Sequence, residues 1–270
     1  MQILNIAGYK FITLTDICML QSYYHAQCHA LSLKGTILLS HEGININLAG
    51  TPCHIQSFQT LLKNDERFMN VTFHESYSTH QPFKHLKIKL KNEIITLRQP
   101  EVNPATKRAP DISPEELKKW LDEKRDITLL DTRNDYEIRF GSFHDAVNLH
   151  LSDFGELPSS IQHMEKNKPI VMFCTGGIRC EKAAHYMLNQ GFSHVYQLDG
   201  GILGYFKNVG GAFYEGECFV FDERVAVDST LQQTGTVQCL ACQGPVTKQQ
   251  QFSPDNAVCP ACVNAAGVDV

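Results

Sequence analysis

Four prolines fall within fifteen residues of the sequence, at Pro100, Pro104, Pro110 and Pro114. Because proline has no amide hydrogen and a fixed φ angle, such a run can neither continue a helix nor lie inside a sheet. The length of 270 residues corresponds to about two domains. We therefore expect an N-terminal domain over 1–99, a linker over 100–112, a central domain over 113–212 and a C-terminal extension over 213–270.

Composition excludes several classes of protein. Hydrophobic residues make up 43% of the chain, which excludes disorder throughout. No apolar run approaches the ~18 residues that span a bilayer, and the N-terminus lacks the basic and apolar regions of a secretion signal. The ten cysteines fall below the ~8–10% of residues typical of secreted disulfide scaffolds. We expect a cytoplasmic protein with no membrane partner, whose cysteines bind metal or perform thiol chemistry.

Before the prolines, apolar runs and turn residues alternate in the order β–α–β–β–α–β. Strands are expected over 3–12, 31–39, 44–48 and 71–75, helices over 14–26 and 54–62, and a pair of strands within 84–97. This order predicts an α+β domain of the split β-α-β type, like ferredoxin and acylphosphatase folds. A hairpin turn over 40–43 carries His41 and Glu42, with Asn45 just beyond it, and these residues fit a site and a polar turn equally well.

The net charge of −5 conceals a basic band. Residues 81–110 carry seven Lys or Arg against two Asp or Glu, a net charge of +5. Alternation along a strand places Lys87, Lys89 and Lys91 on one face, where they could bind phosphates, and Lys107 and Arg108 could extend this patch. Lysines also protect exposed edge strands, so the residues alone support both interpretations equally.

After the prolines, the pattern is that of an open parallel α/β domain. Ser113, Pro114 and Glu116 form a helix start, with serine at the N-cap and proline at the first helical position. Short apolar runs over 127–130, 169–173 and 194–198 are typical of strands covered on both faces, and a helix is expected over 181–190.

The segment CTGGIRCE, from Cys174 to Glu181, joins the second of these strands to the helix. Its two glycines allow a tight turn in which backbone N–H groups point at the Cys174 sulfur. The helix N-terminus and the charge of Arg179 also lower the pKa of a thiol. The pattern favours a thiolate nucleophile over a buried structural cysteine, whereas Cys180 is either a resolving thiol or an ordinary helix residue.

This loop resembles the Cys-x-x-Gly-x-Arg active-site loop of rhodanese-like sulfurtransferase domains. Further resemblance lies in the segments LDTR at 130–133, Glu137, GSF at 141–143, AVN at 146–148 and VYQLDGG at 195–201. Ser142 departs from the family, where histidine is common, and this departure concerns the domain scaffold. Four residues separate Cys174 from Arg179, as in sulfur-handling members, whereas related phosphatases have five.

The resemblance implies a set of site residues. We expect Cys174, Arg179 and Cys180 to be catalytic, and Gly176, Gly177, Ile178, Lys87, Lys89 and Lys91 to bind substrate.

As a whole, the chain resembles the bacterial rhodanese-containing tRNA uridine hydroxylase family. The likeness rests on SHEGIN at 40–45, the CTGGIRCEK loop, ECFVFD at 217–222 and the C-terminal cysteines. It implies oxygen-dependent 5-hydroxylation of wobble uridine 34, with the tRNA anticodon arm as partner, molecular oxygen as co-substrate and Cys174 performing the chemistry. The sequence contains no flavin or nicotinamide motif and no iron site of two histidines and a carboxylate.

Two other functions remain open. The rhodanese loop alone fits a thiosulfate or persulfide sulfurtransferase, in which a sulfur donor charges Cys174 as a persulfide. The other is a non-catalytic binding or regulatory protein that has inherited the loop. The sequence does not predict an oligomeric state.

The remaining cysteines include two Cys-x2-Cys pairs, Cys239 with Cys242 and Cys259 with Cys262. Sixteen residues separate the pairs, a spacing typical of one tetrahedral zinc site. Four thiolates leave no open position on the metal, so we expect a small zinc-ribbon-like tail with a structural role. Two redox-active pairs are the alternative. Packing roles are expected for Cys18, Cys28, Cys53 and Cys218.

Overall fold

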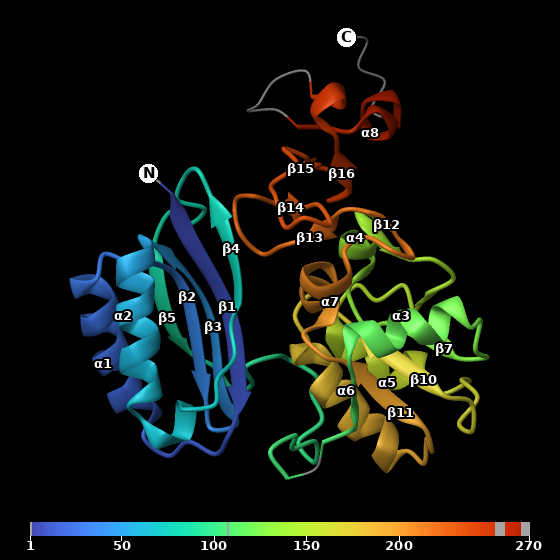
Figure 1. The fold of residues 1–270 in the computed structure, drawn as a ribbon, viewed down its shortest axis with the longest axis horizontal. Helices are drawn as coiled ribbons and strands as arrows, with labels where there is room; N and C mark the ends of the chain where they lie inside the picture. Colours follow the sequence, from blue (N-terminus) through green and yellow to red (C-terminus); the bar gives the residue numbers. More distant parts are fainter. Residues whose placement is uncertain (1, 107, 252–256, 266–270) are drawn as a thin grey trace.

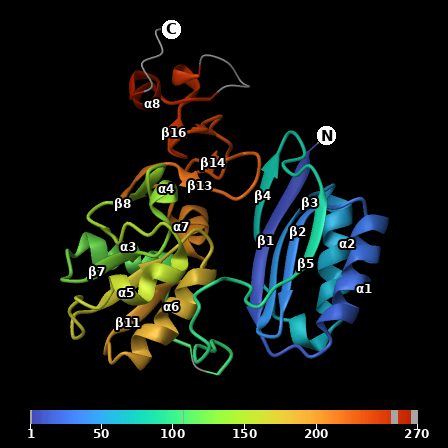
Figure 2. The ribbon, with the colours of Figure 1, turned by 180° about the vertical axis from the view of Figure 1, so that it is seen from behind.

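A computed structural model describes residues 2–106, 108–251 and 257–265. The chain forms an N-terminal domain, a central domain and a C-terminal extension that contacts both (Figures 1 and 2). Lys107, which was expected to extend the basic patch, lies outside the described residues.

The N-terminal domain is one five-stranded sheet with two helices on one face (Figure 1). Its elements are β1 (Ile3–Phe11), α1 (Ile17–Ala30), β2 (Lys34–Ser40), β3 (Gly43–Gly50), α2 (Pro52–Lys63), β4 (His74–Ser78) and β5 (Leu86–Leu90), with a 3-10 turn over Glu66–Phe68. The strand order is β4-β1-β3-β2-β5, antiparallel except for the β2–β5 pair. Apolar residues on one face of the sheet, such as Ile6, Ile37 and Ile46, are buried against the helices. The opposite face of the sheet points toward the central domain (Figure 2).

This arrangement confirms the predicted α+β sandwich but not every strand in it. The expected strand pair within 84–97 is wrong, because only β5 forms there. Beyond it, side chains take over the hydrogen bonds that a partner strand would have made. The Glu42 carboxylate accepts from the Ile94 N–H at 2.7 Å, and the Asn45 amide donates to the Ile94 carbonyl at 3.2 Å.

The central domain is built on a five-stranded parallel sheet of order β6-β11-β10-β7-β9, in which β7, β10 and β11 are the strands that the three apolar runs predict. Its elements are β6 (Asp111–Ile112), α3 (Pro114–Asp122), β7 (Thr128–Asp131), α4 (Asp135–Ile138), β8 (Gly141–Phe143), β9 (Val147–Asn148), α5 (Leu157–Ser160), β10 (Ile170–Phe173), α6 (Ile178–Asn189), β11 (Val195–Leu198) and α7 (Gly201–Val209), with a 3-10 turn over Phe154–Glu156. All four residues of β10 are buried, because two apolar clusters cover the two faces of the sheet. The predicted cap of α3 is present, since the Ser113 hydroxyl accepts from the Glu116 N–H at 3.1 Å.

The proline-rich stretch between the domains packs closely against the central domain. Leu97, Val102 and Ala109 are buried in the same apolar cluster as Cys174. The connection between the domains is therefore anchored at several points along its length.

In its described residues, the C-terminal extension has one strand that pairs with the central domain, two short strand pairs of its own and a helix. β12 (Tyr214–Gly216) pairs with β8, β13 (Cys218–Phe219) with β14 (Ala226–Val227), and β15 (Val237–Gln238) with β16 (Pro245–Val246). A 3-10 turn over Lys248–Gln250 and the helix α8 (Pro260–Ala265) follow. Across the described ranges of the chain, none of the helices has the length and apolar character to cross a membrane.

Candidate functional site

Cys174 stands at the carboxyl end of β10, in the middle of the parallel sheet. The next helix, α6, begins at Ile178, three residues earlier than expected, because Gly177 forms its N-cap with a φ of 99°. A side chain is strained in that conformation, so glycine is needed there. The Gly177 N–H donates to the Cys174 sulfur at 3.1 Å. The strand, the turn and the helix thus surround one sulfur with donors, as the glycine pattern predicts.

The electrostatics of this turn favour the thiolate. Burial works most strongly against ionisation of Cys174, but a hydrogen bond from the Cys180 thiol, the charge of Arg179 and the N–H groups of Arg179 and Gly177 together lower the Cys174 pKa to about 5. Burial and the neighbouring Cys174 raise the pKa of Cys180, so it keeps its proton. The pair therefore consists of one thiolate and one thiol at neutral pH.

Arg179 is held by a carboxylate from another element. Glu137 of α4 accepts from both of its terminal nitrogens, at 2.5 and 2.8 Å, and both side chains are buried. Arg179 therefore acts as a fixed positive charge beside the sulfur, because its hydrogen-bonding edge is already occupied.

A second buried ion pair supports the sheet beneath. Arg133 donates to Asp131 at 2.7 Å, and the Ser142 hydroxyl also donates to Asp131 at 2.7 Å. Ser142 thus supplies a hydrogen bond to the scaffold carboxylate at the position where histidine is common in rhodanese-like domains.

The Cys174 loop, residues 174–181, faces the open side of the N-terminal sheet across a cleft of about 1050 Å³. Cys174, Gly176, Ile178 and Arg179 border the cleft on one side. The opposite side is lined by open-face residues of β1, β2 and β3, among them Tyr9, Phe11, Thr36, Leu38, Asn45 and Asn47. The cleft is large enough for a nucleotide.

Tyr9 and His74 of the N-terminal domain reach the Cys174 loop, and the sequence did not indicate either. The Tyr9 hydroxyl donates to the Glu181 carboxylate of α6 at 2.8 Å. His74 of β4 hydrogen-bonds with the Gly176 backbone, and burial is the main reason that its pKa is lowered. Both stand alone in strands far from position 174, so no spacing pattern could connect them with it.

Two carboxylates anchor the domains to each other. Lys182 of α6 is buried, and its ammonium contacts Glu42 at 2.8 Å and Glu93 at 2.6 Å. Glu42 thus has a docking role. The His41 side chain contacts the Leu14 carbonyl of the same domain, through its Nδ1 at 2.8 Å.

The three predicted substrate-binding lysines do not line the cleft but stand near it. Lys87 and Lys89 lie on β5, an edge strand, in register with Thr36 and Leu38. Paired residues in register share a sheet face, so both lysines are exposed on the cleft side of the sheet. Lys91 is exposed just past the end of β5. Arg108 is occupied, because its guanidinium contacts Asp111 and Glu181, each at 3.2 Å.

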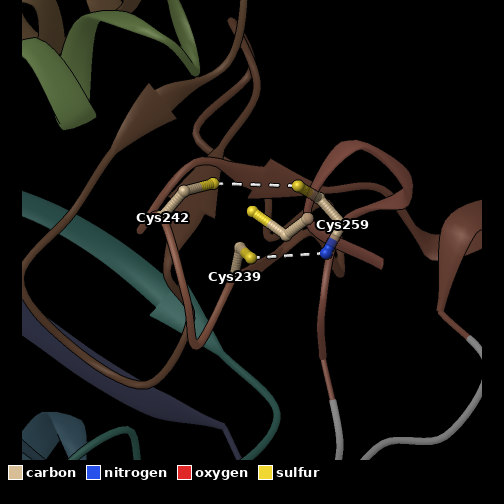
Figure 3. A group of neighbouring side chains, drawn as sticks. Cys239, Cys242 and Cys259 are labelled. Carbon is tan, nitrogen blue, oxygen red and sulfur yellow. Dashed lines mark hydrogen bonds between the residues drawn. The ribbon is translucent and has the colours of Figure 1, made fainter. Parts of the chain in front are cut away.

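The C-terminal cysteines form the candidate metal centre. The sulfurs of Cys239, Cys242, Cys259 and Cys262 all lie within 4.8 Å of one another (Figure 3). The Cys259 N–H also donates to the Cys239 sulfur at 3.3 Å, a contact typical of thiolate ligands. Arg139, next to α4, donates to the Cys242 carbonyl at 3.0 Å and to its sulfur at 3.4 Å. The four cysteines could hold a metal ion, and the site is fixed to the central domain.

Comparison with known proteins matches the two domains separately. Residues 3–94 match the model of the UPF0176 acylphosphatase like domain, and residues 113–208 match the rhodanese-like domain. These matches confirm the predicted acylphosphatase-like and rhodanese-like folds.

Curated relatives match the chain over nearly its whole length. A protein of Cupriavidus metallidurans named tRNA uridine(34) hydroxylase is 47% identical over 98% of each chain. One of Burkholderia vietnamiensis with the same name is 44% identical, over 98% of this chain and 99% of the relative. Among solved structures, a rhodanese-like domain from Anabaena is 24% identical, covers 40% of this chain and 79% of its own, and has a TM-score of 0.35.

Proposed function

The chain belongs to the tRNA uridine(34) hydroxylase family, and from this membership we propose that it hydroxylates C5 of the wobble uridine in tRNA. The observation that carries the proposal is the cleft, where the low-pKa Cys174 faces the open side of an α+β sheet. A thiolate there meets a substrate between two domains, out of bulk water. The proposed substrate places the protein in the cytoplasm.

The overall reaction replaces C5–H by C5–OH and consumes one molecule of oxygen. The second oxygen atom leaves as water, which requires two electrons and two protons. Oxidation of the Cys174 thiolate and the Cys180 thiol, its hydrogen-bonded neighbour, to a disulfide supplies both electrons and one proton, and the solvent supplies the second proton. We assign Cys174 as the reactive thiolate and Cys180 as the resolving thiol, with an external thiol reducing the disulfide after each turnover.

The anticodon arm is the proposed occupant of the open sheet face. Lys87 and Lys89 are exposed on this side and neutralise phosphates, while Gly176 and Ile178, which line the cleft, contact the nucleotide at Cys174. Gly177 is buried and acts by shaping the turn around the Cys174 sulfur. Contacts between the lysines and the RNA phosphates position the RNA, and contacts within the cleft select its base.

Zinc is the proposed metal of the C-terminal site. Four sulfurs suit a tetrahedral ion, and a closed shell of thiolates gives it a structural role. The stretch between the cysteine pairs has little apolar surface, so metal binding supplies the free energy that folds it.

The decisive experiment measures 5-hydroxyuridine by mass spectrometry. Purified protein is incubated with unmodified tRNA, a thiol reductant and 18O-labelled oxygen. Wild-type protein and a Cys53→Ser control, altered at an exposed cysteine, should form labelled 5-hydroxyuridine at position 34, and Cys174→Ser should form none. Undiminished product with Cys174→Ser would remove the assigned role of that thiol. Thiosulfate:cyanide sulfur transfer without any tRNA product would favour the sulfurtransferase function instead.

A further inference from the structure

Phe221 is an exposed aromatic residue within the catalytic cleft. Its side chain is 57% exposed, whereas Phe219, two residues earlier in the same segment, is only 7% exposed. Phe221 lines the cleft together with Cys174. The Arg179 guanidinium carbon lies 5.8 Å from the centre of its ring, which places the ring beside the catalytic loop.

The segment that carries Phe221 is fixed on several sides. The Arg224 guanidinium binds Asp222 at 2.6 Å and the Ser76 hydroxyl of β4 at 2.7 Å. The Glu223 N–H donates to the Pro82 carbonyl at 3.0 Å. The residues that follow Phe221 are therefore anchored to the N-terminal domain, and the Phe221 ring packs at 5.2 Å against Phe219 in edge-on geometry. Because the segment is already restrained, the ring loses little further mobility when a ligand binds.

Exposure alone does not identify a ligand, because other large apolar residues are exposed as well. Met19, Met69 and Leu240 have similar exposure, and none of them lines the cleft. Phe221 differs because its free face lies in the same hollow as a reactive thiolate. Burying such a ring against a ligand removes apolar surface from water, which stabilises the complex.

We propose that Phe221 stacks on the uracil base of the wobble nucleotide and holds it in the cleft next to Cys174. This inference rests on the proposed function. Anticodon bases belong to a single-stranded loop, and proteins recognise such bases by stacking them on aromatic side chains. One stacked base contributes about 1–3 kcal/mol, which corresponds to roughly 5- to 150-fold in affinity. The C-terminal extension thereby supplies part of the substrate site.

Fluorescence can observe this contact directly, because the chain has a single tryptophan, Trp120. Trp120 lies on α3, where it packs against Tyr196 and donates to Glu116, outside the cleft. A Trp120→Phe, Phe221→Trp protein therefore carries its only tryptophan at the proposed stacking position. The probe is an anticodon stem–loop RNA with uridine at position 34, compared with the same RNA lacking that base.

Both RNAs should bind, as followed by the anisotropy of a label on the RNA. Only the RNA with the base should strongly quench the tryptophan fluorescence. Equal quenching by the two RNAs, or binding without quenching, would overturn the inference.

Kinetics provide the second test. Phe221→Ala should raise the KM for tRNA about tenfold or more with a smaller change in kcat, and Phe221→Tyr should restore it. Tyr77→Ala is the matched control, since Tyr77 is 43% exposed but pairs with Leu4 on the helix side of the sheet. An unchanged KM for Phe221→Ala in an active enzyme would contradict stacking. Base-dependent quenching in the Trp120→Phe, Phe221→Trp protein, together with no hydroxylation by the wild-type enzyme, would instead contradict the proposed function and leave the stacking contact standing.

Discussion

The Glu137 carboxylate accepts hydrogen bonds from both terminal nitrogens of Arg179, at 2.5 and 2.8 Å, and both side chains are almost fully buried. The arginine of this loop therefore affects the chemistry through its charge and its position. Its charge is one of the factors that lower the Cys174 pKa.

Replacing Arg179 should separate the effect of its charge on the Cys174 pKa from its effect on the stability of the protein. In Arg179→Met, the Cys174 pKa should rise from about 5, because a positive charge beside the thiolate is lost. The free energy of unfolding should fall by about 3–5 kcal/mol, because the buried Glu137 loses its partner. Iodoacetamide alkylation as a function of pH measures the first effect, and urea unfolding the second.

The double variant Glu137→Gln, Arg179→Met is the control. It should recover most of the lost stability, because no buried charge remains unpaired, while the Cys174 pKa stays high. A double variant with a restored low pKa would show that Arg179 does not act through its charge.

Cys180→Ala tests the contact between the two thiols. The Cys180 hydrogen bond favours the Cys174 thiolate, so its removal should raise the Cys174 pKa. In wild-type protein, alkylation should increase as the pH rises through about 5 and level off above it. In the variant this increase should occur at higher pH. Identical pH profiles would exclude the hydrogen bond as a cause of the low pKa.

Lys182→Met should loosen the contact between the two domains. The buried ammonium balances Glu42 and Glu93, whose side chains are 19% and 22% exposed. Two neighbouring carboxylates without their cation repel each other, and partial solvent access limits the loss of stability to about 2–3 kcal/mol. Chemical denaturation measures this loss. Neutralising the carboxylates as well, with Glu42→Gln and Glu93→Gln, should reverse much of it, and a stable single variant would contradict the docking role.

Lys87→Gln, Lys89→Gln should weaken tRNA binding mainly at low salt. Each lost phosphate contact lowers the slope of log affinity against log salt by about 0.7–0.9. Filter binding over a range of salt concentrations measures that slope. Lys63→Gln, on the helix side of the domain, should leave it unchanged, and equal slopes for all three proteins would show that the β5 lysines do not contact RNA.

Metal analysis should find about one zinc ion per chain, since four thiolates complete a tetrahedral shell. Cys259→Ser should lose the metal, whereas Cys53→Ser should keep it. Hydrogen exchange should then accelerate over 237–251 and 257–263 and stay slow in β10. Full protection of the extension in metal-free protein would contradict a structural role.

The sequence pattern predicted the features that are formed by residues close together in the sequence. The Cys174 turn was predictable because the donors around its sulfur come from residues within six positions of it. The four C-terminal cysteines were predictable for the same reason, since each pair occupies one tight turn.

Contacts distant in sequence escaped prediction. Tyr9 and His74 reach the catalytic loop from strands that precede it by about one hundred residues or more, and their own surroundings resemble any half-buried strand. The expected second strand after β5 failed for a related reason. The alternating residues of 84–97 fit a pair of strands. The hydrogen bonds of the Ile94 backbone, however, are made with the side chains of Glu42 and Asn45, which lie outside this segment.

Segments far apart in the sequence build the cleft, which has a consequence for biosynthesis. Tyr9 belongs to β1, whereas Phe221 follows the whole central domain. A nascent chain that has folded only as far as α7 already holds its reactive thiolate, but it has no completed chamber for an RNA base. The cleft is therefore complete only after the segment that carries Phe221 has been made.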